Sequence, residues 1–333
     1  MRLLILGGTD FVGRAIAEDA VARGWEVTVF HRGTGPAPAG VRALHGDRTA
    51  ADGLAALSSP SGPEEWDAVV DTWSAAPSVV RDSARLLAPR AGRYAYVSSR
   101  SVYAYPAAPG GDETRAVVDG DPDAGDVEYA QAKRGGELAA LDSFGAARTL
   151  LLRAGLVLGP YENIGRLPWW LTRIARGGDV LAPGPREQGL QYVDARDLAA
   201  FTLDALRDER SGPYDVVCPR GFASTGELLE ACVAAVNPSG ARLRWTDAEV
   251  ILAAGIEPWL QLPAWLPPGE DYDALMTSDT ARAQAAGLRC RPVTETVRDT
   301  WAWLTSIGGT APQRGDRPVV GLDPGVEAGV LGR

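Results

Sequence analysis

Near its N-terminus the chain reads Arg2-Leu3-Leu4-Ile5-Leu6-Gly7-Gly8-Thr9-Asp10-Phe11-Val12-Gly13. The short apolar run at 2–6 is typical of a parallel strand that is buried on both faces. An amphipathic helix is expected from Arg14 to Arg23, and a second strand from Trp25 to Phe30. A strand, a glycine-rich turn, a helix and a second strand within about 30 residues predict a nucleotide-binding βαβ unit.

The glycine turn is expected to hold the pyrophosphate of a dinucleotide. Glycine lets the backbone approach phosphate oxygens, and the helix that follows directs its N-terminus at them. The predicted cofactor contacts in this turn are Gly7, Gly8, Thr9, Phe11, Val12 and Gly13. Asp10 stands where the usual pattern has its middle glycine. Its carboxylate would repel a pyrophosphate, so it is expected to face solvent or to pair with an arginine such as Arg14 or Arg32.

The end of the second strand predicts which cofactor is bound. A carboxylate there would accept a hydrogen bond from the ribose 2′-hydroxyl of NAD, but this chain has His31-Arg32-Gly33. The cation favours a 2′-phosphate, so NADP(H) is the predicted cofactor and NAD(H) the alternative. Asp47 follows a third strand (Val41–Leu44) and is expected to accept from the adenine amino group. Arg48 and Thr72 are further candidate cofactor contacts.

A tyrosine and the only lysine of the chain stand four residues apart, at Tyr129 and Lys133. On a helix this spacing places both side chains on one face. The ammonium would favour phenolate over phenol and lower the pKa of Tyr129, which suits a proton donor to a carbonyl oxygen. Ser98 and Ser99 end a predicted fifth strand, Tyr94–Ser99, and active sites of such sheets lie at the carboxyl ends of strands.

Four motifs occur in a fixed order: Gly7-Gly8-Thr9-x-Phe11-Val12-Gly13, Val97-Ser98-Ser99-x-Ser101-Val102-Tyr103, Tyr129-x3-Lys133 and Leu152-Arg153-x-Gly155-Leu156-Val157-Leu158-Gly159-Pro160. Over roughly residues 1–305 the chain thereby resembles the extended short-chain dehydrogenases/reductases of the NAD(P)-dependent epimerase/dehydratase-like superfamily. The resemblance implies an α/β fold with a Rossmann-type doubly wound parallel sheet. It also implies that Ser99 and Tyr129 are catalytic, and that Lys133 activates Tyr129 and binds the nicotinamide ribose.

Two departures from these relatives narrow the predicted reaction. Sugar-nucleotide 4,6-dehydratases carry an Asp-Glu pair directly after the catalytic hydroxyl residue, where this chain has Arg100 and Ser101. Sugar 4-epimerases carry Arg-Tyr-x-Asn, where this chain has Arg153-Ala154-Gly155-Leu156. The Gly-Gly-Thr-x-Phe-Val-Gly form and the later Gln191-Tyr192-Val193-Asp194-Ala195-Arg196-Asp197-Leu198 resemble a reductase-like subgroup of the superfamily. The resemblance therefore favours an NADP(H)-dependent reductase acting on a carbonyl or imine of a small or medium organic molecule. The alternatives are an epimerase that works through a transient ketone and a non-enzymatic nucleotide-sensing or RNA-binding homologue.

The second half is expected to bind the substrate. Residues 1–160 are predicted to form the cofactor domain, 161–310 a mixed substrate-binding or lid region with returning Rossmann elements, and 311–333 a linker with a short helix (Val320–Leu331). The residues that follow the sixth strand are candidate substrate contacts: Tyr161, Asn163, Arg166, Trp169 and Trp170. Tryptophan suits a bulky substrate because it offers apolar area and one donor. The segment Glu257–Pro268 is either a lid or a packed connector, and Thr294–Thr305 is predicted to be helical.

The composition excludes several classes of function. A net charge of −10 leaves no basic surface for a phosphate backbone, so nucleic acid is not an expected partner. Two histidines and three scattered cysteines without CxxC spacing argue against a metal site and a disulfide framework. No apolar run approaches the roughly 20 residues of a membrane helix, so the chain is predicted to be cytoplasmic, with no membrane partner.

Self-association as a homodimer is predicted through two helices, Ser78–Leu87 and Tyr129–Phe144. Ala84, Leu138 and Ala139 are expected on the exposed faces of these helices, and relatives commonly pair there as a two-fold bundle. The alternative is that these residues pack on the sheet.

Overall fold

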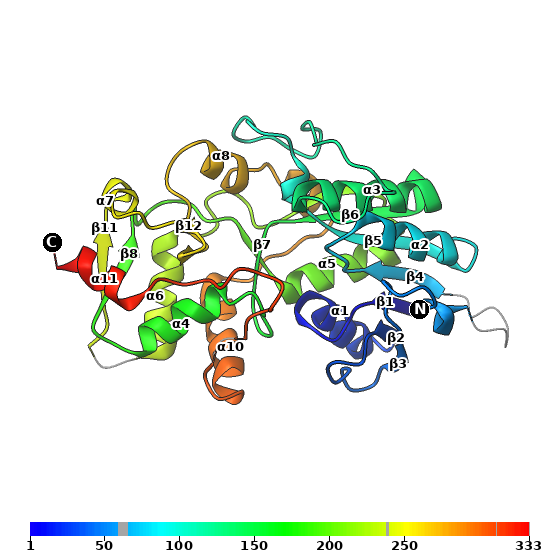
Figure 1. Ribbon diagram of the computed structural model, residues 1–333, viewed down its shortest axis with the longest axis horizontal. Helices are drawn as coiled ribbons and strands as arrows, with labels where there is room; N and C mark the ends of the chain where they lie inside the picture. The colour runs from blue at the N-terminus through cyan, green and yellow to red at the C-terminus, as the bar shows by residue number, and fades with distance from the viewer. Residues whose placement is uncertain (59–65, 238–239, 311, 333) are drawn as a thin grey trace.

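The computed structural model describes residues 1–58, 66–237, 240–310 and 312–332 of the 333-residue chain. Its main sheet has seven strands in the order β10-β6-β5-β4-β1-β2-β3, all paired in parallel (Figure 1). The strands are β1 (Arg2–Leu6), β2 (Glu26–His31), β3 (Arg42–His45), β4 (Trp66–Asp71), β5 (Ala91–Ser99), β6 (Thr149–Ala154) and β10 (Gly212–Val216). The predicted doubly wound α/β fold is confirmed.

Helices cover both faces of this sheet, and alternate residues of each strand supply the two cores. On one face α1 (Phe11–Ala22) and α5 (Ala195–Arg207) pack over Leu3 and Ile5. On the other face α2 (Pro77–Leu87) and α3 (Tyr129–Phe144) pack over Leu4 and Leu6. Because side chains alternate across a strand, a continuous apolar run is what a sheet buried on both faces requires.

The strand order reverses between β1 and β4, which places their carboxyl ends at a switch point of the sheet. Ligands of open parallel sheets bind in the crevice outside such a point, because the loops there diverge to opposite faces. The glycine turn follows β1, and Thr72 follows β4. The Thr72 backbone N–H and Oγ1 both donate to the Leu6 carbonyl, at 3.2 and 3.0 Å, so these two loops are joined directly.

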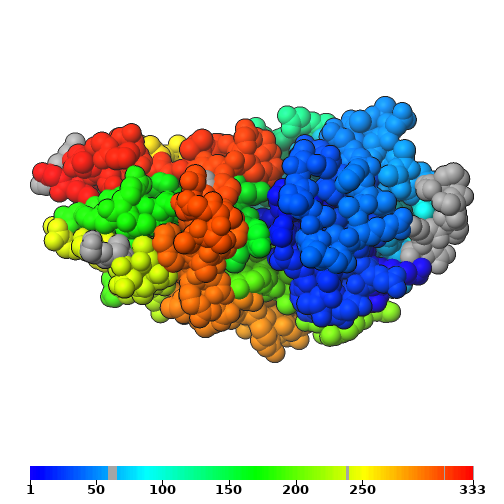
Figure 2. Space-filling view, turned by 90° about the horizontal axis from the view of Figure 1, so that it is seen from below, coloured from blue at the N-terminus to red at the C-terminus, as the bar shows by residue number. Residues whose placement is uncertain are grey.

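The second half forms a smaller layer beside the sheet, and only β10 returns to the main sheet among the strands after β6 that the structure describes. Figure 2 shows the blue N-terminal elements at one end of the molecule, red C-terminal atoms at the other end, and orange elements in the middle, beside the blue ones. The short strands here are β7 (Leu156–Leu158), β8 (Asp179–Pro183), β9 (Tyr192–Asp194), β11 (Arg242–Thr246), β12 (Pro258–Trp259) and β13 (Leu262–Pro263). The remaining helices are α4 (Arg166–Ala175), α6 (Thr225–Val236), α7 (Ala248–Ala253), α8 (Glu270–Met276), α9 (Ala281–Ala285), α10 (Val293–Ser306) and α11 (Pro324–Leu331), with 3-10 turns η1 (Ala55–Leu57), η2 (Arg100–Val102) and η3 (Ala146–Arg148).

The proline-rich segment 257–268 is a packed connector rather than a lid. Leu262 and Trp265 are buried in the core of the second half, and the Trp265 indole N–H donates to the Gly184 carbonyl at 3.3 Å. Such burial anchors the segment, because a tryptophan withdrawn from a core exposes a large apolar area.

Two expectations about helices need correction. The last helix begins at Pro324 rather than Val320, because Asp323 caps it by accepting from the N–H groups of Gly325 and Val326. Ala84 and Ala139 do not lie on exposed faces of their helices but are completely buried against the sheet. The homodimer itself remains a prediction, but Ala84 and Ala139 cannot contribute to its interface. Among the described residues, no helix is long and apolar enough to cross a membrane.

Candidate active site

The glycines of this turn are packed so closely that a side chain would not fit at their positions. A Cβ on Gly7 would collide with Thr72 Oγ1, and one on Gly13 would lie 2.7 Å from the Gly8 nitrogen. Gly7 and Gly8 also have φ values of 115° and 91°, which favour glycine. The start of α1 is therefore pressed against the end of β1, and the predicted contacts Thr9, Phe11 and Val12 lie at this same turn.

Asp10 is exposed and precedes α1 without capping it. Arg14 pairs with Glu18 at 2.8 Å, and Asp10 forms no ion pair within the described ranges. The solvent-facing alternative therefore holds. The hydrogen bond to Asp316 is the main cause of the raised pKa of Arg314, and the charge of Asp10 adds to it. The same charge counteracts the lowering of the pKa of His31 by burial.

His31 and Arg32 end β2 in different environments. His31 is buried with its ring 4.8 Å from that of His45, and burial followed by the His45 charge lowers its pKa. Its Nδ1 accepts from the Gly33 N–H, and its buried Nε2 has no hydrogen-bond partner among the described residues. Arg32 is exposed and close enough to Asp47 to lower the pKa of that carboxyl. An open cation therefore stands where an NAD-binding carboxylate would stand.

Asp47 and Arg48 are neighbours in sequence with different roles. Oδ1 of Asp47 accepts from the N–H and Oγ1 of Thr49, and these bonds are the main cause of the lowered pKa of Asp47. Arg48 instead donates two 2.7 Å bonds to buried Asp71 and another to Ser83 Oγ. The placement of Arg48 contradicts its predicted cofactor contact, because its donors are used by Asp71 at the end of β4 and by Ser83 and Val79 of α2.

Lys133 lies buried between two strand ends. Its Nζ donates to the carbonyls of Trp73, after β4, and Val97, in β5, both at 2.6 Å. A Cβ on Gly136 would collide with Tyr96, so this glycine lets α3 lie close enough for the lysine to reach. Burial lowers the pKa of Lys133 to about 7, and the charges of Arg317 and Arg314 act in the same direction against Asp71 and Glu137.

Tyr129 and Ser99 both precede this lysine in the chain and lie on α3 and at the end of β5. Tyr129 begins α3, one helical turn before Lys133, and is 38% exposed. Ser99 ends β5 two residues after Val97, and its Oγ accepts from the Ser101 N–H at 3.1 Å. The fold thus brings the three predicted catalytic residues to the carboxyl end of the sheet, next to the switch point.

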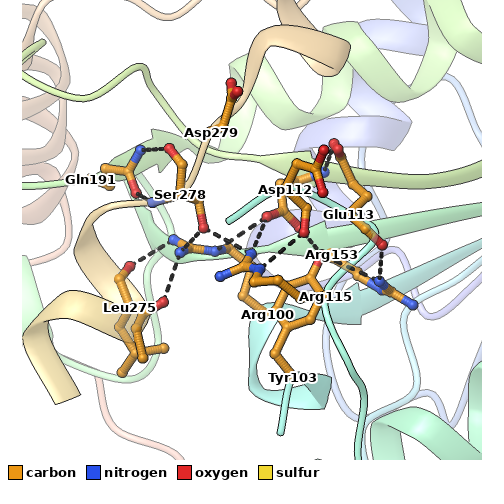
Figure 3. Close-up of polar contacts among 12 residues, drawn as sticks. Arg100, Tyr103, Asp112, Glu113, Arg115, Arg153, Gln191, Leu275, Ser278 and Asp279 are labelled. Carbon is orange, nitrogen blue, oxygen red and sulfur yellow. Dashed lines mark hydrogen bonds and ion pairs between the residues drawn. The ribbon is translucent and has the colours of Figure 1, made fainter. Parts of the chain in front are cut away.

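Arg100 occupies the position of a dehydratase acid, but its side chain turns away into a buried network (Figure 3). It is 2% exposed and donates to the carbonyls of Leu275 and Ala274 at 2.7 and 3.2 Å and to Ser278 Oγ. Burial lowers its pKa, opposed by the charge of Asp215. Arg100 therefore fastens the end of α8 to the sheet and offers no acid or base to a substrate.

A second part of this network contacts the end of β5, which carries Ser98 and Ser99. This part could not be predicted from the sequence. Buried Glu137 accepts from Ser98 Oγ at 2.8 Å and from two nitrogens of Arg153 at 2.9 and 3.0 Å. Arg134 donates to the same carboxylate at 3.0 Å. These bonds join α3, β5 and β6 immediately behind Ser99, so they fix the strand end that carries the serine.

The candidate substrate residues divide into two groups. The guanidinium carbon of Arg14 lies 4.4 Å from the centroid of the Tyr161 ring. The guanidinium carbon of Arg166 lies 5.2 Å from the centroid of the Trp259 ring. Asn163 accepts from the Arg314 N–H at 2.9 Å. Trp170, by contrast, is 1% exposed and donates to the Pro263 carbonyl, and Trp169 packs edge-on against it.

The placement of Trp170 contradicts the prediction of a substrate contact, because the residue belongs to the core. Glu162, which the sequence did not single out, is also buried, and it accepts from the N–H groups of Arg166 and Leu167 at 2.6 and 3.2 Å. Burial raises the pKa of Glu162 to about 7. Its two bonds hold the first turn of α4, and with it Arg166.

Comparison with known proteins adds the family. The family model of the NAD dependent epimerase/dehydratase family matches residues 3–218. The chain belongs to this family. Its membership confirms the predicted resemblance to extended short-chain dehydrogenases/reductases and supports an enzyme. No curated protein sequence matches the chain significantly.

Solved structures of this family share the fold. The chain is similar to the Bordetella bronchiseptica enzyme WbmG in complex with NAD and UDP, at 19% identity and a TM-score of 0.67, covering 96% of this chain and 99% of that one. It is also similar to WbmH from the same organism in complex with NAD+, at 18% identity and a TM-score of 0.64, covering 92% and 99%. A UDP-glucose 4-epimerase from Thermus thermophilus in complex with NAD gives 21% identity and a TM-score of 0.62, covering 92% and 99%.

The C-terminal arginines are the part of the site that sequence reasoning missed. The segment that precedes the last helix was predicted to be a linker, yet Arg317 lies with its guanidinium carbon 5.2 Å from the centroid of the Tyr129 ring. The signal in the sequence is weak, because two arginines in a glycine-rich stretch are usually solvated. No metal-binding group of histidine, cysteine or acidic residues occurs in the described part of the chain.

Proposed function

We propose that this protein is an NADP(H)-dependent oxidoreductase that transfers hydride to a carbonyl or imine of a small or medium organic molecule. The observation that carries the proposal is the placement of the only lysine. Lys133 is buried one helical turn from Tyr129 and is held by two carbonyls at the switch point of the sheet. An ammonium at this depth serves chemistry better than stability, since burying a charge costs free energy.

The glycine turn fits a dinucleotide. Gly7, Gly8 and Gly13 leave the backbone bare where a Cβ would collide, and the N-terminus of α1 faces the same turn. Thr9, Phe11 and Val12 would line the pyrophosphate, while Asp47 and the exposed Arg32 would hold the adenosine end. When bound, the nicotinamide supplies or accepts the hydride.

Tyr129 would exchange a proton with the substrate oxygen. The Lys133 ammonium favours the phenolate form, so the phenol gives up its proton more readily when the lysine is charged. Ser99 would donate a hydrogen bond to the same oxygen and fix its position, which requires its hydroxyl to turn from Ser101 Oγ, to which it donates at 3.1 Å. Arg100, buried and bonded to the Leu275 and Ala274 carbonyls, supplies no second acid and base for eliminating water.

The test is net cofactor turnover. Purified protein is incubated with a panel of ketones, aldehydes and imines, and oxidation of NADPH and NADH is followed by absorbance. The proposal expects turnover with at least one compound, a preference for NADPH, and loss of turnover in Tyr129→Phe. Binding of neither cofactor by calorimetry would refute it.

An epimerase is the second candidate, and the comparisons favour it. Three similar structures hold NAD, and one of them is a UDP-glucose 4-epimerase. An epimerase oxidises and re-reduces one carbon within a single catalytic cycle, so it inverts a substrate without consuming cofactor. Incubation with nucleotide-linked sugars, analysed by NMR for the inverted epimer, separates this candidate from the reductase.

A further inference from the structure

Two side chains of α3 hold the strand end that carries Ser99. The helix packs on β5 and β6 (Figure 1). The Lys133 ammonium donates to the Val97 carbonyl at 2.6 Å. One helical turn further along, the Glu137 carboxylate accepts from Ser98 Oγ at 2.8 Å. The two bonded residues of β5 are consecutive, so α3 grips the chain at both positions immediately before the predicted catalytic serine.

The acceptor positions of the Glu137 carboxylate are all used by protein groups. Its Oε1 accepts from Ser98 Oγ and from Arg153 Nε, the latter at 2.9 Å. Its Oε2 accepts from Arg153 Nη2 and Arg134 Nη1, both at 3.0 Å. A carboxylate has about four lone-pair sites, so this one has no acceptor left for a substrate or a cofactor. Glu137 can therefore act on the site only through its neighbours.

Stability alone is a weak reason to keep the buried pair of Glu137 and Arg153. Replacing a buried ion pair by apolar side chains is often neutral or stabilising, because the desolvation of both ions is then avoided. The pair also lies at a particular place. Tyr129, Lys133 and Glu137 follow one another at intervals of four residues, so they share one face of α3. That face is directed at the end of β5.

The surroundings of the Lys133 ammonium show why a carboxylate near it matters. Its Nζ donates to two carbonyl groups, those of Trp73 and Val97, and lies 4.8 Å from the centroid of the Tyr96 ring. Within the described ranges no carboxylate contacts it. A buried ammonium without a carboxylate in contact depends on charges further away to stay protonated.

The charged groups around Lys133 act on it in opposite directions. Burial is the main influence and lowers the pKa of Lys133 to about 7. Two arginines add to the lowering and two carboxylates oppose it: Arg317 and Arg314, and Asp71 and Glu137. Of the two carboxylates, only Glu137 lies on the same helix as the lysine and also bonds the strand that carries the serine.

We infer that Glu137 is a positioning residue of the active site, which fixes the end of β5 through Ser98 and places a negative charge one helical turn from the Lys133 ammonium. The inference rests on the proposed function in giving Tyr129, Ser99 and Lys133 their roles. Glu137 holds the serine on β5 at a constant distance from the tyrosine on α3. Its charge also helps the lysine to remain an ammonium.

The first test uses the fact that Lys133 is the only lysine of the chain. Untagged protein labelled with ¹³C at the lysine Cε gives one lysine signal in an NMR spectrum, and its chemical shift follows the loss of the ammonium proton as pH rises. Glu137→Gln keeps the size of the side chain and removes its charge, so the midpoint should move to lower pH by about one unit. Glu137→Asp keeps the charge and should restore most of the difference.

Two control variants separate the charge from the packing. Ser98→Ala removes the bond to the strand and no charge, so its midpoint should equal that of the wild-type protein. Asp142→Asn removes an exposed carboxylate from the same helix and should also leave the midpoint unchanged. An unmoved midpoint in Glu137→Gln, or an equal movement in Ser98→Ala, overturns the inference.

A further variant covers loss of folding, which thermal unfolding of each protein detects. If Glu137→Gln is unstable, Arg134→Gln replaces it, because Arg134 is 20% exposed and donates to the same carboxylate. Without this cation the charge of Glu137 is less neutralised, so the midpoint should rise. An unmoved midpoint in Arg134→Gln then overturns the inference.

The second test measures the position of the serine. With a carbonyl compound that the wild-type protein reduces, Ser98→Ala should lower kcat by about tenfold, because a displaced catalytic group reacts more slowly. Its affinity for NADP+ should change little, since the glycine turn is untouched. Asp142→Asn is again the control and should keep the wild-type kcat. A wild-type kcat in Ser98→Ala overturns the positioning role.

The proposed function can fail separately. If neither NADP+ nor NAD+ binds and no compound is reduced, the proposed oxidoreductase is refuted. The ¹³C titration needs neither cofactor nor substrate, so it still decides whether Glu137 acts on Lys133.

Discussion

Two groups of arginines flank the catalytic helix α3 and differ in how their charges are balanced. In the buried group, Arg115 and Arg153 reach the carboxylates of Asp215 and Glu137 at 2.5 and 2.9 Å. Arg100 of the same group donates to the Leu275 carbonyl (Figure 3). In the open group, Arg166 has no polar partner among the described residues, and Arg317 has one long bond to a serine.

The difference separates structural charges from charges that await a ligand. Burying an ion is tolerated when the remaining hydrogen bonds are satisfied, as they largely are around Asp215 and Glu137. In the open group no carboxylate of the described residues contacts either guanidinium. The charge of Glu162 acts on Arg166 without such a contact, and Arg317 lies over the ring of Tyr129, the proposed proton donor. We therefore expect changes in the buried group to reduce stability and changes in the open group to alter binding or rate.

The largest expected effect is on stability, from Asp215→Ala. Asp215 is fully buried and accepts from Tyr103 and Arg115 at 2.5 Å each. Removing it leaves buried guanidinium charge uncompensated, so the free energy of unfolding should fall by about 3–5 kcal/mol. The matched control is Asp316→Ala, which removes the 61% exposed partner of Arg314 and should cost no more than about 1 kcal/mol. Guanidinium unfolding curves measure both, and equal losses would contradict the comparison.

The second expected effect is on rate alone. Tyr129→Phe removes the phenolic proton while keeping the ring that packs under Arg317. We expect kcat to fall by a factor on the order of 10² or more, with cofactor affinity little changed. Steady-state kinetics and calorimetry provide the two numbers. Activity close to that of the wild-type protein would remove Tyr129 from the mechanism.

A smaller effect is expected from pH. Lysine is cationic below its pKa, and burial lowers that of Lys133 to about 7. The charge that favours the Tyr129 phenolate is therefore lost as pH rises through about 7, so kcat/KM of the free enzyme should decline on this alkaline side.

Lys133→Arg should lose most activity, because a guanidinium cannot take the ammonium's place between two carbonyls. Its residual activity should lack the decline, and a pH profile like that of the wild-type protein would argue against this role.

The smallest effect concerns cofactor choice. Arg32 is exposed and directly follows β2. Like Arg166 and Arg317, it forms no ion pair in the described part of the chain. Arg32→Ala should weaken NADPH by about tenfold and NADH much less, because only NADPH carries the 2′-phosphate. Calorimetric titration with both cofactors tests this. A wild-type protein that prefers NADH would show that Arg32 stays solvated.

Local patterns predicted much of the cofactor half. The bounds of β1 agree with the apolar run at 2–6, because a strand buried on both faces leaves a continuous apolar signature. The helix that carries Tyr129 and Lys133 was recognised from a four-residue spacing. Predictions failed where burial reversed the role of a charged or aromatic side chain. Arg48 was expected at the cofactor but pairs with Asp71, and Trp170 was expected at the substrate but lies in the core.

The sequence by itself determined the βαβ unit, the glycine turn and the spacing of Tyr129 and Lys133. Each of these features depends on residues that are close to one another in the sequence. Only the tertiary structure decided which arginines are neutralised and which stay open. Arg100 and Arg317 are both arginines near glycine or serine in loops, and nothing local distinguishes them. Their partners come from segments far along the chain, Leu275 and Asp215 for one and Tyr129 for the other. Long-range packing sets burial, and burial decides whether a charge must be balanced by the protein or is left for a ligand.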